Sequence, residues 1–366
     1  MTPTAPHPPA RPDTPREGDP PLPGVRMDTH IPTPLWDELT AEAGDSVLPS
    51  QTSGWRDAVC ANGWQDASRV YTWPDGTRLL VPLVCSAETG TYASWPEGWG
   101  VGGVVGRPGA LTPERARTVV EDLAALPARE VYLRPDTAST ALWEPLMPKG
   151  TTRNPRMTQV LDLTGGFEKV WRDSFTKRAR GAVRRAERSG LDVERDGTGR
   201  LVPEFQRLFE LSATRWARQA DTTPNGTPGN TLDGTPDDVL RRVREKNPPT
   251  KFAAVARHLG NACQIWLASR ENTPIAALMA LHHGPQTVYW AAAMDKEAAG
   301  QSQAPTYLVH LMIEDACARG ARTLHMGDTY PGTSVTRFKA AFGPAEHHTA
   351  GFRIPGSGAT REEGTT

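Results

Sequence analysis

The stretch TLHMGDTYPGTSVTRFKAAFG, residues 323–343, is the part of the sequence from which we interpret the fold. Its first four residues are mostly apolar and predict a short buried strand. Gly327 and Asp328 then open a loop rich in turn residues, and a short amphipathic segment with Phe338 and Lys339 follows. A buried strand that presents one cation beside an aromatic ring suits the stabilisation of a developing negative charge.

The overall composition sets limits on fold and partners. The chain has 366 residues, of which 37% are hydrophobic, which suggests two domains or one large one. Its 41 basic and 42 acidic residues nearly cancel, so a polyanion would have to be bound by a local patch. The four cysteines form neither a CxxC motif nor a Cys/His cluster, so we predict no zinc site and no disulfide framework.

The location expected for this chain is the cytoplasm. No apolar run approaches the roughly 20 residues that are needed to span a bilayer. The N-terminal residues lack the apolar segment of a signal peptide. We therefore expect a soluble protein with reduced cysteines and no membrane span.

The order of the predicted elements indicates a mixed α/β fold. In the first half we expect two helices near Trp36 and Trp55, a hairpin around the turn at residues 74–76, a loop over 95–109, a helix from Thr112 to Leu126 and a strand over 130–133. The second half predicts strands over 157–163, 191–194, 263–269, 275–282, 287–294 and 323–326, with helices over 167–189, 205–217, 237–244 and 306–319.

This order of elements suggests two α/β units in tandem. We expect a disordered Pro-rich tail over residues 1–30, units over 31–156 and 157–354, and a disordered tail over 355–366. The polar loop over 221–234 is longer than most connections, so we expect it to be mobile, and a role as a lid is left open.

The segment KRARGAVRRAER, residues 177–188, is strongly basic. Helical spacing brings Lys177, Arg180, Arg184 and Arg188 onto one stripe, while small residues form the opposite, packing face. Repulsion between like charges is easier to accommodate if an anion binds there, and the planar guanidinium suits phosphate. We predict phosphate binding, with a solvated helix face as the alternative.

Other candidate residues give weaker signals. Tyr289 and Trp290 adjoin on a predicted strand, so one ring should face each side; core packing and the floor of a binding site are both open. The adjacent pairs His282-His283 and His347-His348 also point to opposite faces, so we predict no metal site. The sequence contains no GxSxG, HExxH or Walker motif.

Two motifs resemble those of the Fem-type aminoacyl transferases. The first is GFEKVW followed by SFTKRARGAVRRAERSG, and the second is FKAAFG. The matching positions are Arg178, Arg180, Val183, Ala186, Gly190, Leu191, Phe338, Lys339, Phe342 and Gly343. The residues from Gln51 to Trp55 also resemble an early segment of that family. The likeness spans about residues 45–355, and it is diffuse outside the two motifs.

The resemblance implies two tandem domains of the N-acetyltransferase (GNAT) type, each a mixed sheet flanked by helices. It also implies transfer of an aminoacyl group from aminoacyl-tRNA to an amine of a small-molecule or peptidoglycan-precursor-like acceptor. By this resemblance Arg178 and Arg180, with Arg184 on the same helix, would contact a phosphate of the acceptor. Lys339 would stabilise the transition state beside Phe338, and no cofactor would be required.

The chain also departs from that family. It shows no sustained heptad for a tRNA-binding coiled coil, so it resembles the shorter members, some of which build antibiotics. The acyl-CoA branch has a Gly-rich loop before a helix, but residues 298–308 read AAGQSQAPTYL, with one Gly and Pro305. This argues against acetyl-CoA as the donor, and an acyl-CoA-dependent transferase stays open as the alternative.

An aminoacyl ester is already activated, so its attack by an amine requires no covalent nucleophile. The protein must position the reactants and stabilise the tetrahedral oxyanion. We expect Lys339 to supply that stabilisation and Asp328 to accept a proton or to hold Lys339. A binding module without catalytic activity, which uses the arginines on a phosphorylated ligand, is the third hypothesis.

Overall fold

The computed structural model describes residues 24–220, 234–329 and 331–358. The predicted loop over 221–234, apart from Gly234, and most of the two predicted tails lie outside these ranges. The described part begins with a short strand, β1 (Arg26–Asp28), which pairs with β3 (Arg69–Thr72). Ordered structure therefore starts before residue 31, earlier than the sequence predicts.

The N-terminal half, residues 24–151, contains short strands and helices. After β1 come α1 (Thr33–Ala43), η1 (Gly44–Ser46), η2 (Pro49–Gln51), α2 (Ser53–Cys60), β2 (Gln65–Asp66), β3, β4 (Arg78–Val81), β5 (Val84–Ser86), β6 (Thr91–Ala93), α3 (Pro113–Ala125), β7 (Glu130–Leu133), α4 (Thr140–Trp143) and η3 (Glu144–Leu146). The predicted hairpin and the predicted helix after Thr112 are confirmed. The hydroxyl of Thr112 accepts a hydrogen bond from the backbone N–H of Arg115, as expected for a helix cap.

The C-terminal half, residues 152–358, has longer elements. They are β8 (Thr152–Asp162), α5 (Phe167–Asp173), α6 (Lys177–Glu187), β9 (Asp192–Asp196), α7 (Val202–Ala220), α8 (Pro236–Lys246), α9 (Pro249–Leu259), η4 (Gly260–Ala262), β10 (Cys263–Arg270), β11 (Thr273–His283), β12 (Gln286–Met294), α10 (Lys296–Ser302), α11 (Ala304–Ala318), β13 (Thr323–Thr329), α12 (Ser334–Ala340) and β14 (Ala345–Pro355). The predicted single helix over 167–189 is wrong, because α5 ends at Asp173 and α6 starts at Lys177.

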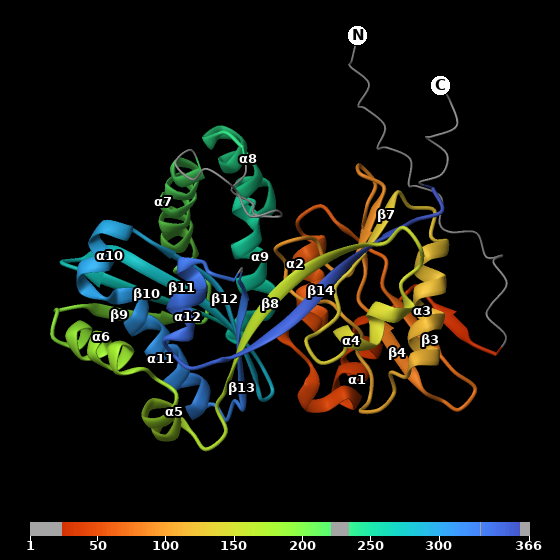
Figure 1. Cartoon of the computed structure of the whole chain (residues 1–366), viewed down its shortest axis with the longest axis horizontal. Coiled ribbons are helices and arrows are strands. Elements are labelled where there is room, and N and C mark those ends of the chain that lie inside the picture. The colour runs from red at the N-terminus through yellow and green to blue at the C-terminus, as the bar shows by residue number, and fades with distance from the viewer. Residues whose placement is uncertain (1–23, 221–233, 330, 359–366) are drawn as a thin grey trace, which may run out of the picture.

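One sheet runs through both halves. Among the described residues its strand order is β2-β5-β6-β7-β14-β8-β13-β12-β11-β10-β9, while β1, β3 and β4 form a separate small sheet. Figure 1 shows β8 and β14 as two long strands that run side by side between the two lobes. The predicted unit boundary at residues 156/157 falls inside β8, and the division into two units stays a prediction.

Each half contains one parallel strand pair. β6 and β7 pair in parallel with α3 between them in the chain, and β12 and β13 do so with α10 and α11 between them. The other pairs in the described sheets are antiparallel. The same strand–helix–strand unit therefore occurs twice, and the expected mixed α/β fold is confirmed.

Three apolar clusters form the core. The first cluster joins the two halves, because Trp36 and Trp55 of the N-terminal half share it with Phe205 and Phe252 of the C-terminal half. The second cluster lies between the C-terminal part of the sheet and α5, α6 and α11. The third cluster packs α3 and β7 of the N-terminal half against β14 of the C-terminal half. Because one cluster draws on both halves, burial of apolar surface stabilises their contact.

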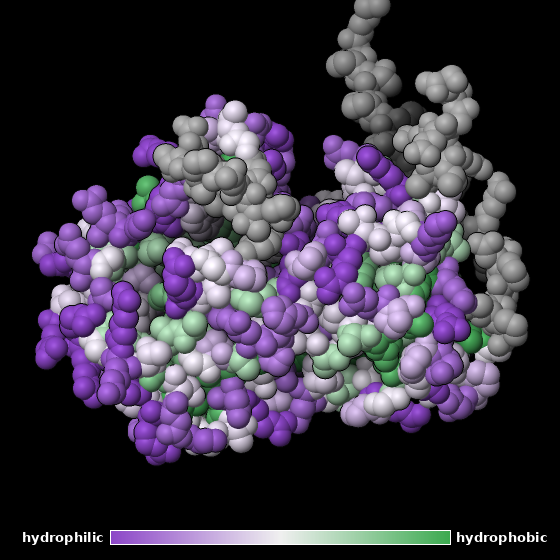
Figure 2. Space-filling model, in the orientation of Figure 1, coloured by the Kyte–Doolittle hydropathy of each residue, from purple (hydrophilic) through white to green (hydrophobic). Residues whose placement is uncertain are grey.

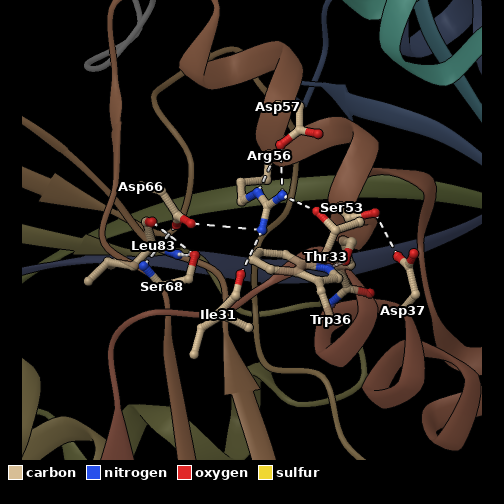
Figure 3. A network of polar contacts seen from close by, with 11 residues as sticks. Ile31, Thr33, Trp36, Asp37, Ser53, Arg56, Asp57, Asp66, Ser68 and Leu83 are labelled. Carbon is tan, nitrogen blue, oxygen red and sulfur yellow. Dashed lines mark hydrogen bonds and ion pairs between the residues drawn. The ribbon is translucent and has the colours of Figure 1, made fainter.

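A buried arginine fixes the beginning of the N-terminal half (Figure 3). Arg56 on α2 is 8% exposed. Its Nη1 donates to the carbonyl of Ile31 at 3.0 Å, and its Nη2 donates to the hydroxyl of Thr33 at 2.9 Å. Its guanidinium also lies 5.1 Å from the ring of Trp36 and forms an ion pair with Asp57. These contacts hold the chain segment that leads into α1 against α2.

Candidate functional site

The two sequence motifs meet in space. The backbone N–H of Thr176, between α5 and α6, donates to the carbonyl of Ala341 at 2.9 Å, next to the end of α12. Gly343 has a φ of 80°, and a Cβ there would lie 2.4 Å from the carbonyl oxygen of Ser174. Only glycine fits such a close approach. The FKAAFG motif is thus fixed against the corner between α5 and α6.

The strands β12 and β13 separate next to these motifs. Their parallel pairing covers only Gln286 to Val288 against Thr323 to His325. Directly after it, both strands carry a bulge, one at Trp290 against β11 and one between His325 and Asp328 against β8. Bulges of this kind bend a strand and redirect its side chains. Gly327, with a φ of 71°, lies in the second bulge.

Lys339 reaches the place where the two strands part. It lies on α12 and is 6% exposed. Its Nζ donates to the carbonyl oxygens of Gly327 at 3.3 Å and Asp328 at 3.2 Å, and lies 5.9 Å from the ring centre of Tyr289. An ammonium group has three N–H donors. In the described part of the chain two of them meet an acceptor, and the third meets none there.

Burial changes the acidity of this lysine. Desolvation lowers the pKa of Lys339 to about 8, and the nearby carboxylate of Asp328 opposes that shift. The ammonium form therefore predominates at neutral pH. Because water is largely excluded, a charge–oxyanion interaction here would be stronger than at the surface.

Asp328 is held from two sides. Its Oδ2 accepts from Nη2 of Arg134 at 2.6 Å, and its Oδ1 accepts from the hydroxyl of Thr158 at 2.9 Å. Arg134 directly follows β7, so residues near the ends of the second strands of both parallel pairs meet here. A carboxylate with a donor on each oxygen is poorly placed to accept a proton. The geometry favours Asp328 as a residue that fixes the strand beneath Lys339.

The predicted aromatic residues separate into two groups. Tyr289 packs with the second cluster beneath Lys339, and burial raises the pKa of its hydroxyl. Phe338 lies 5.5 Å from Phe342 in the same cluster. Trp290 faces the other side of β12 and contacts Trp55 and Phe252 in the first cluster. The opposite orientation of the two neighbours is as predicted, and Trp290 lies away from Lys339.

The arginines of α6 differ in their exposure and in their partners. Nη1 of Arg180 donates to the carbonyls of Phe175 at 2.6 Å, Trp171 at 3.1 Å and Arg172 at 3.1 Å. This guanidinium closes the C-terminal end of α5, since the last carbonyls of a helix lack partners within it. Arg178 is exposed, and in the predicted stripe Lys177, Arg184 and Arg188 are exposed whereas Arg180 is half-buried, so the stripe is divided. A phosphate role for these three residues stays a prediction.

Arg134 was not among the predicted site residues. Its only signal was its position directly after a predicted strand, which many residues share. In the described residues, no three His, Cys, Asp or Glu side chains gather in a way that could hold a metal ion. No helix in the same ranges is long and apolar enough to cross a membrane.

Comparison with known proteins identifies the C-terminal half. Residues 173–340 match the family model described as an acetyltransferase (GNAT) domain. This segment therefore resembles an acyltransferase domain of the GNAT type. It contains α6, both strands that part and Lys339, so the site described above lies within the matched residues. No curated protein sequence matches the chain.

Solved structures resemble the whole chain. A conserved protein of unknown function from Bacteroides thetaiotaomicron has a TM-score of 0.51 at 10% identity, covering 90% of this chain and 99% of its own. FemX has a TM-score of 0.49 at 15% identity, with 90% and 97% covered. L-PGS from Bacillus licheniformis has 0.46 at 14%, with 89% and 93% covered. The GNAT match confirms the expected acyltransferase.

Proposed function

We propose that this acyltransferase moves an aminoacyl group from aminoacyl-tRNA to an amine of a small-molecule or peptidoglycan-precursor-like acceptor. The observation that carries the proposal is Lys339, a buried ammonium with one donor left, at the point where β12 and β13 part. The site needs no metal and no covalent nucleophile for this reaction, because the ester of the donor is already activated.

In the proposed reaction the acceptor nitrogen attacks the ester carbonyl carbon of the donor. A C–N bond forms, and the carbonyl electron pair becomes an oxyanion beside the ammonium of Lys339. The intermediate then breaks the ester C–O bond, and the departing ribose oxygen takes up the proton that the nitrogen loses. Asp328 and Arg134 would keep the β13 carbonyls, and thus Lys339, in place.

The donor side has one specific supporting observation. Residues 298–308, where an acyl-CoA enzyme would have a Gly-rich loop, form the end of α10, the left-handed residue Gln303 and the start of α11. Pro305 lacks the N–H that would face a pyrophosphate at the start of α11. The match to an acetyltransferase model favours the alternative, an acyl-CoA-dependent N-acyltransferase.

The test is a search for a new amide by mass spectrometry. Purified protein is added to a small-molecule extract with charged tRNA, with deacylated tRNA, with RNase-treated charged tRNA, or with acetyl-CoA. The proposal predicts one new amide that requires intact charged tRNA and is lost in Lys339→Ala. A product that forms with acetyl-CoA after RNase treatment would select the alternative, and no product from either donor would contradict both.

A further inference from the structure

The exposed face of α6, taken together with Arg188 directly after its last residue, carries five cationic side chains: Lys177, Arg178, Arg184, Arg185 and Arg188. In the described part of the chain, none of the five forms an ion pair with a carboxylate. Glu187 is the single acidic residue of the helix. Figure 2 shows hydrophilic surface over the edge of the molecule where Figure 1 places α6. A chain of net charge −1 thus concentrates positive charge at one edge.

The helix α8 shows what a balanced basic helix looks like in the same protein. Its Arg241 pairs with Asp238 at 3.4 Å and with Glu245 at 3.0 Å, and Arg244 pairs with Glu210 at 3.0 Å. These charges are solvated and matched within the chain. The charges of α6 repel one another without such compensation, which costs a few tenths of a kcal/mol per pair on an isolated helix.

The length of the cationic face exceeds what one small anion needs. From Lys177 to Arg188 the helix rises by about 16 Å, which is several times the size of a phosphate group. Arginines predominate, and their planar guanidinium binds phosphate through two parallel hydrogen bonds. An extended partner with repeated phosphates fits this face better than a single phosphate of an acceptor.

The chemistry of α6 also favours a nucleic acid over a membrane surface. Helices that lie on membranes expose a large apolar face. The apolar residues of α6, Ala179, Ala182, Val183 and Ala186, are all buried, and Ala179 belongs to the second cluster. None of the exposed large hydrophobic side chains in the described ranges, Met27, Leu211 and Val335, lies on this helix.

We propose that the exposed face of α6 is an RNA-docking surface that binds the phosphate backbone of the tRNA donor. This assignment rests on the proposed function for the identity of the RNA. It separates two roles within one helix, because Arg180 is bound to the carbonyls of α5 while the five exposed cations meet the partner. Since backbone phosphates are the same in every tRNA, this surface contributes affinity and no choice of amino acid.

The experiment measures binding of deacylated tRNA by the full-length protein between about 50 and 200 mM salt. The test variant is Arg184→Ala/Arg185→Ala, and the matched control is Arg241→Ala/Arg244→Ala on α8. For the test variant we expect a loss of affinity of about tenfold or more at low salt, and a slope of log Kobs against log salt that is smaller by about 2. The control should keep the wild-type slope.

Other results would overturn the assignment. They are an unchanged slope in the α6 variant, an equal loss in the α8 control, or no binding of tRNA. Binding to vesicles of phosphatidylcholine and phosphatidylserine that depends on Arg184 and Arg185, with tRNA affinity unaffected, would assign the face to a membrane. Because no aminoacyl transfer is measured, α6-dependent tRNA binding without any new amide would leave this inference standing and remove the proposed reaction.

Discussion

Two buried lysines, Lys251 and Lys339, have similar surroundings. They differ in how many of their N–H donors form hydrogen bonds within the described chain. Both have an ammonium group against aromatic rings and backbone carbonyls. Lys251 on α9 is 1% exposed, and its Nζ donates to Gly98 O at 2.7 Å, Lys246 O at 3.0 Å and Asn247 Oδ1 at 3.0 Å. All three of its donors are therefore used within the chain.

Lys339 uses only two of its donors on carbonyls in the described residues. Burial lowers the pKa of both lysines, to about 7 for Lys251, where Lys246 adds to the effect, and to about 8 for Lys339. A shifted pKa alone thus does not separate a structural lysine from a reacting one. A donor without an acceptor in the described residues, at a place where two strands part, is therefore the better indication of a reacting lysine.

The largest expected effect is on the rate of transfer. Lys339→Ala should lower kcat about 10²–10³-fold, since losing one oxyanion donor typically costs about 3–4 kcal/mol of barrier. Lys251→Met should keep kcat, per folded molecule, within about threefold, because its ammonium is not available to a substrate. Single-turnover rates with charged tRNA measure both. Equal losses of kcat in the two variants would contradict the distinction between the two lysines.

The next prediction concerns stability, to which Lys251 should contribute more than Lys339. Lys251→Met removes the donor from three partly buried hydrogen bonds, which join Gly98 of one half to the turn from α8 to α9. We expect the free energy of unfolding to fall by about 1–3 kcal/mol, the range for leaving a polar group inside a protein without its partner. Lys339→Met should lose less. Urea denaturation decides this, and a stable Lys251→Met variant would contradict the structural role.

A third prediction concerns the support that Lys339 has and Lys251 lacks. Asp328→Asn removes the charge that Arg134 binds at 2.6 Å, and it should loosen the strand whose carbonyls hold Lys339. We expect kcat/KM to fall about tenfold, which corresponds to about 1.4 kcal/mol. The exposed pair of Arg153 and Glu144 is the control, and Arg153→Ala should keep the wild-type value. A wild-type rate for Asp328→Asn would remove Asp328 from the site.

A fourth prediction concerns α6, where Arg180 resembles Lys251 because its side chain donates to backbone carbonyls. Arg180→Ala should lower the free energy of unfolding by about 1–2 kcal/mol, because it exposes carbonyls at the end of α5. Arg184→Ala should change it by less than about 0.5 kcal/mol, as is usual at the surface. Thermal melts of the two variants measure the difference. Matching melts would show that Arg180 does not hold the corner.

The sequence predicted the parts of the fold that local signals determine. Thr112 caps its helix, and residues 323–326 lie within a partly buried strand, as the patterns indicated. The break between α5 and α6 was missed, because it depends on the cap at Thr176 and on contact with Ala341. α9 was not predicted, although Pro249 is its first residue and proline is common at that position.

At the site, the motif pointed to Lys339, since a short sequence pattern includes it. Arg134 lies 194 residues before its partner Asp328, so no local pattern could join them. The structural role of Lys251 was not predicted for the same reason, because its three acceptors come from two separate segments. β14 was also not predicted. At its Gly351 a Cβ would lie 2.5 Å from the hydroxyl oxygen of Tyr132.

The pH dependence of the transfer step tests whether the charge of Lys339 stabilises the transition state. A lysine is charged below its pKa, so the donor on Lys339 is present below about pH 8 and is lost as the pH rises through that value. Single-turnover rates, corrected for titration of the acceptor amine, should therefore fall above about pH 8 in the wild type and in Lys251→Met. In Lys339→Ala the residual rate should lack this decline. A decline that persists in Lys339→Ala would contradict the claim that the charge of Lys339 stabilises the transition state.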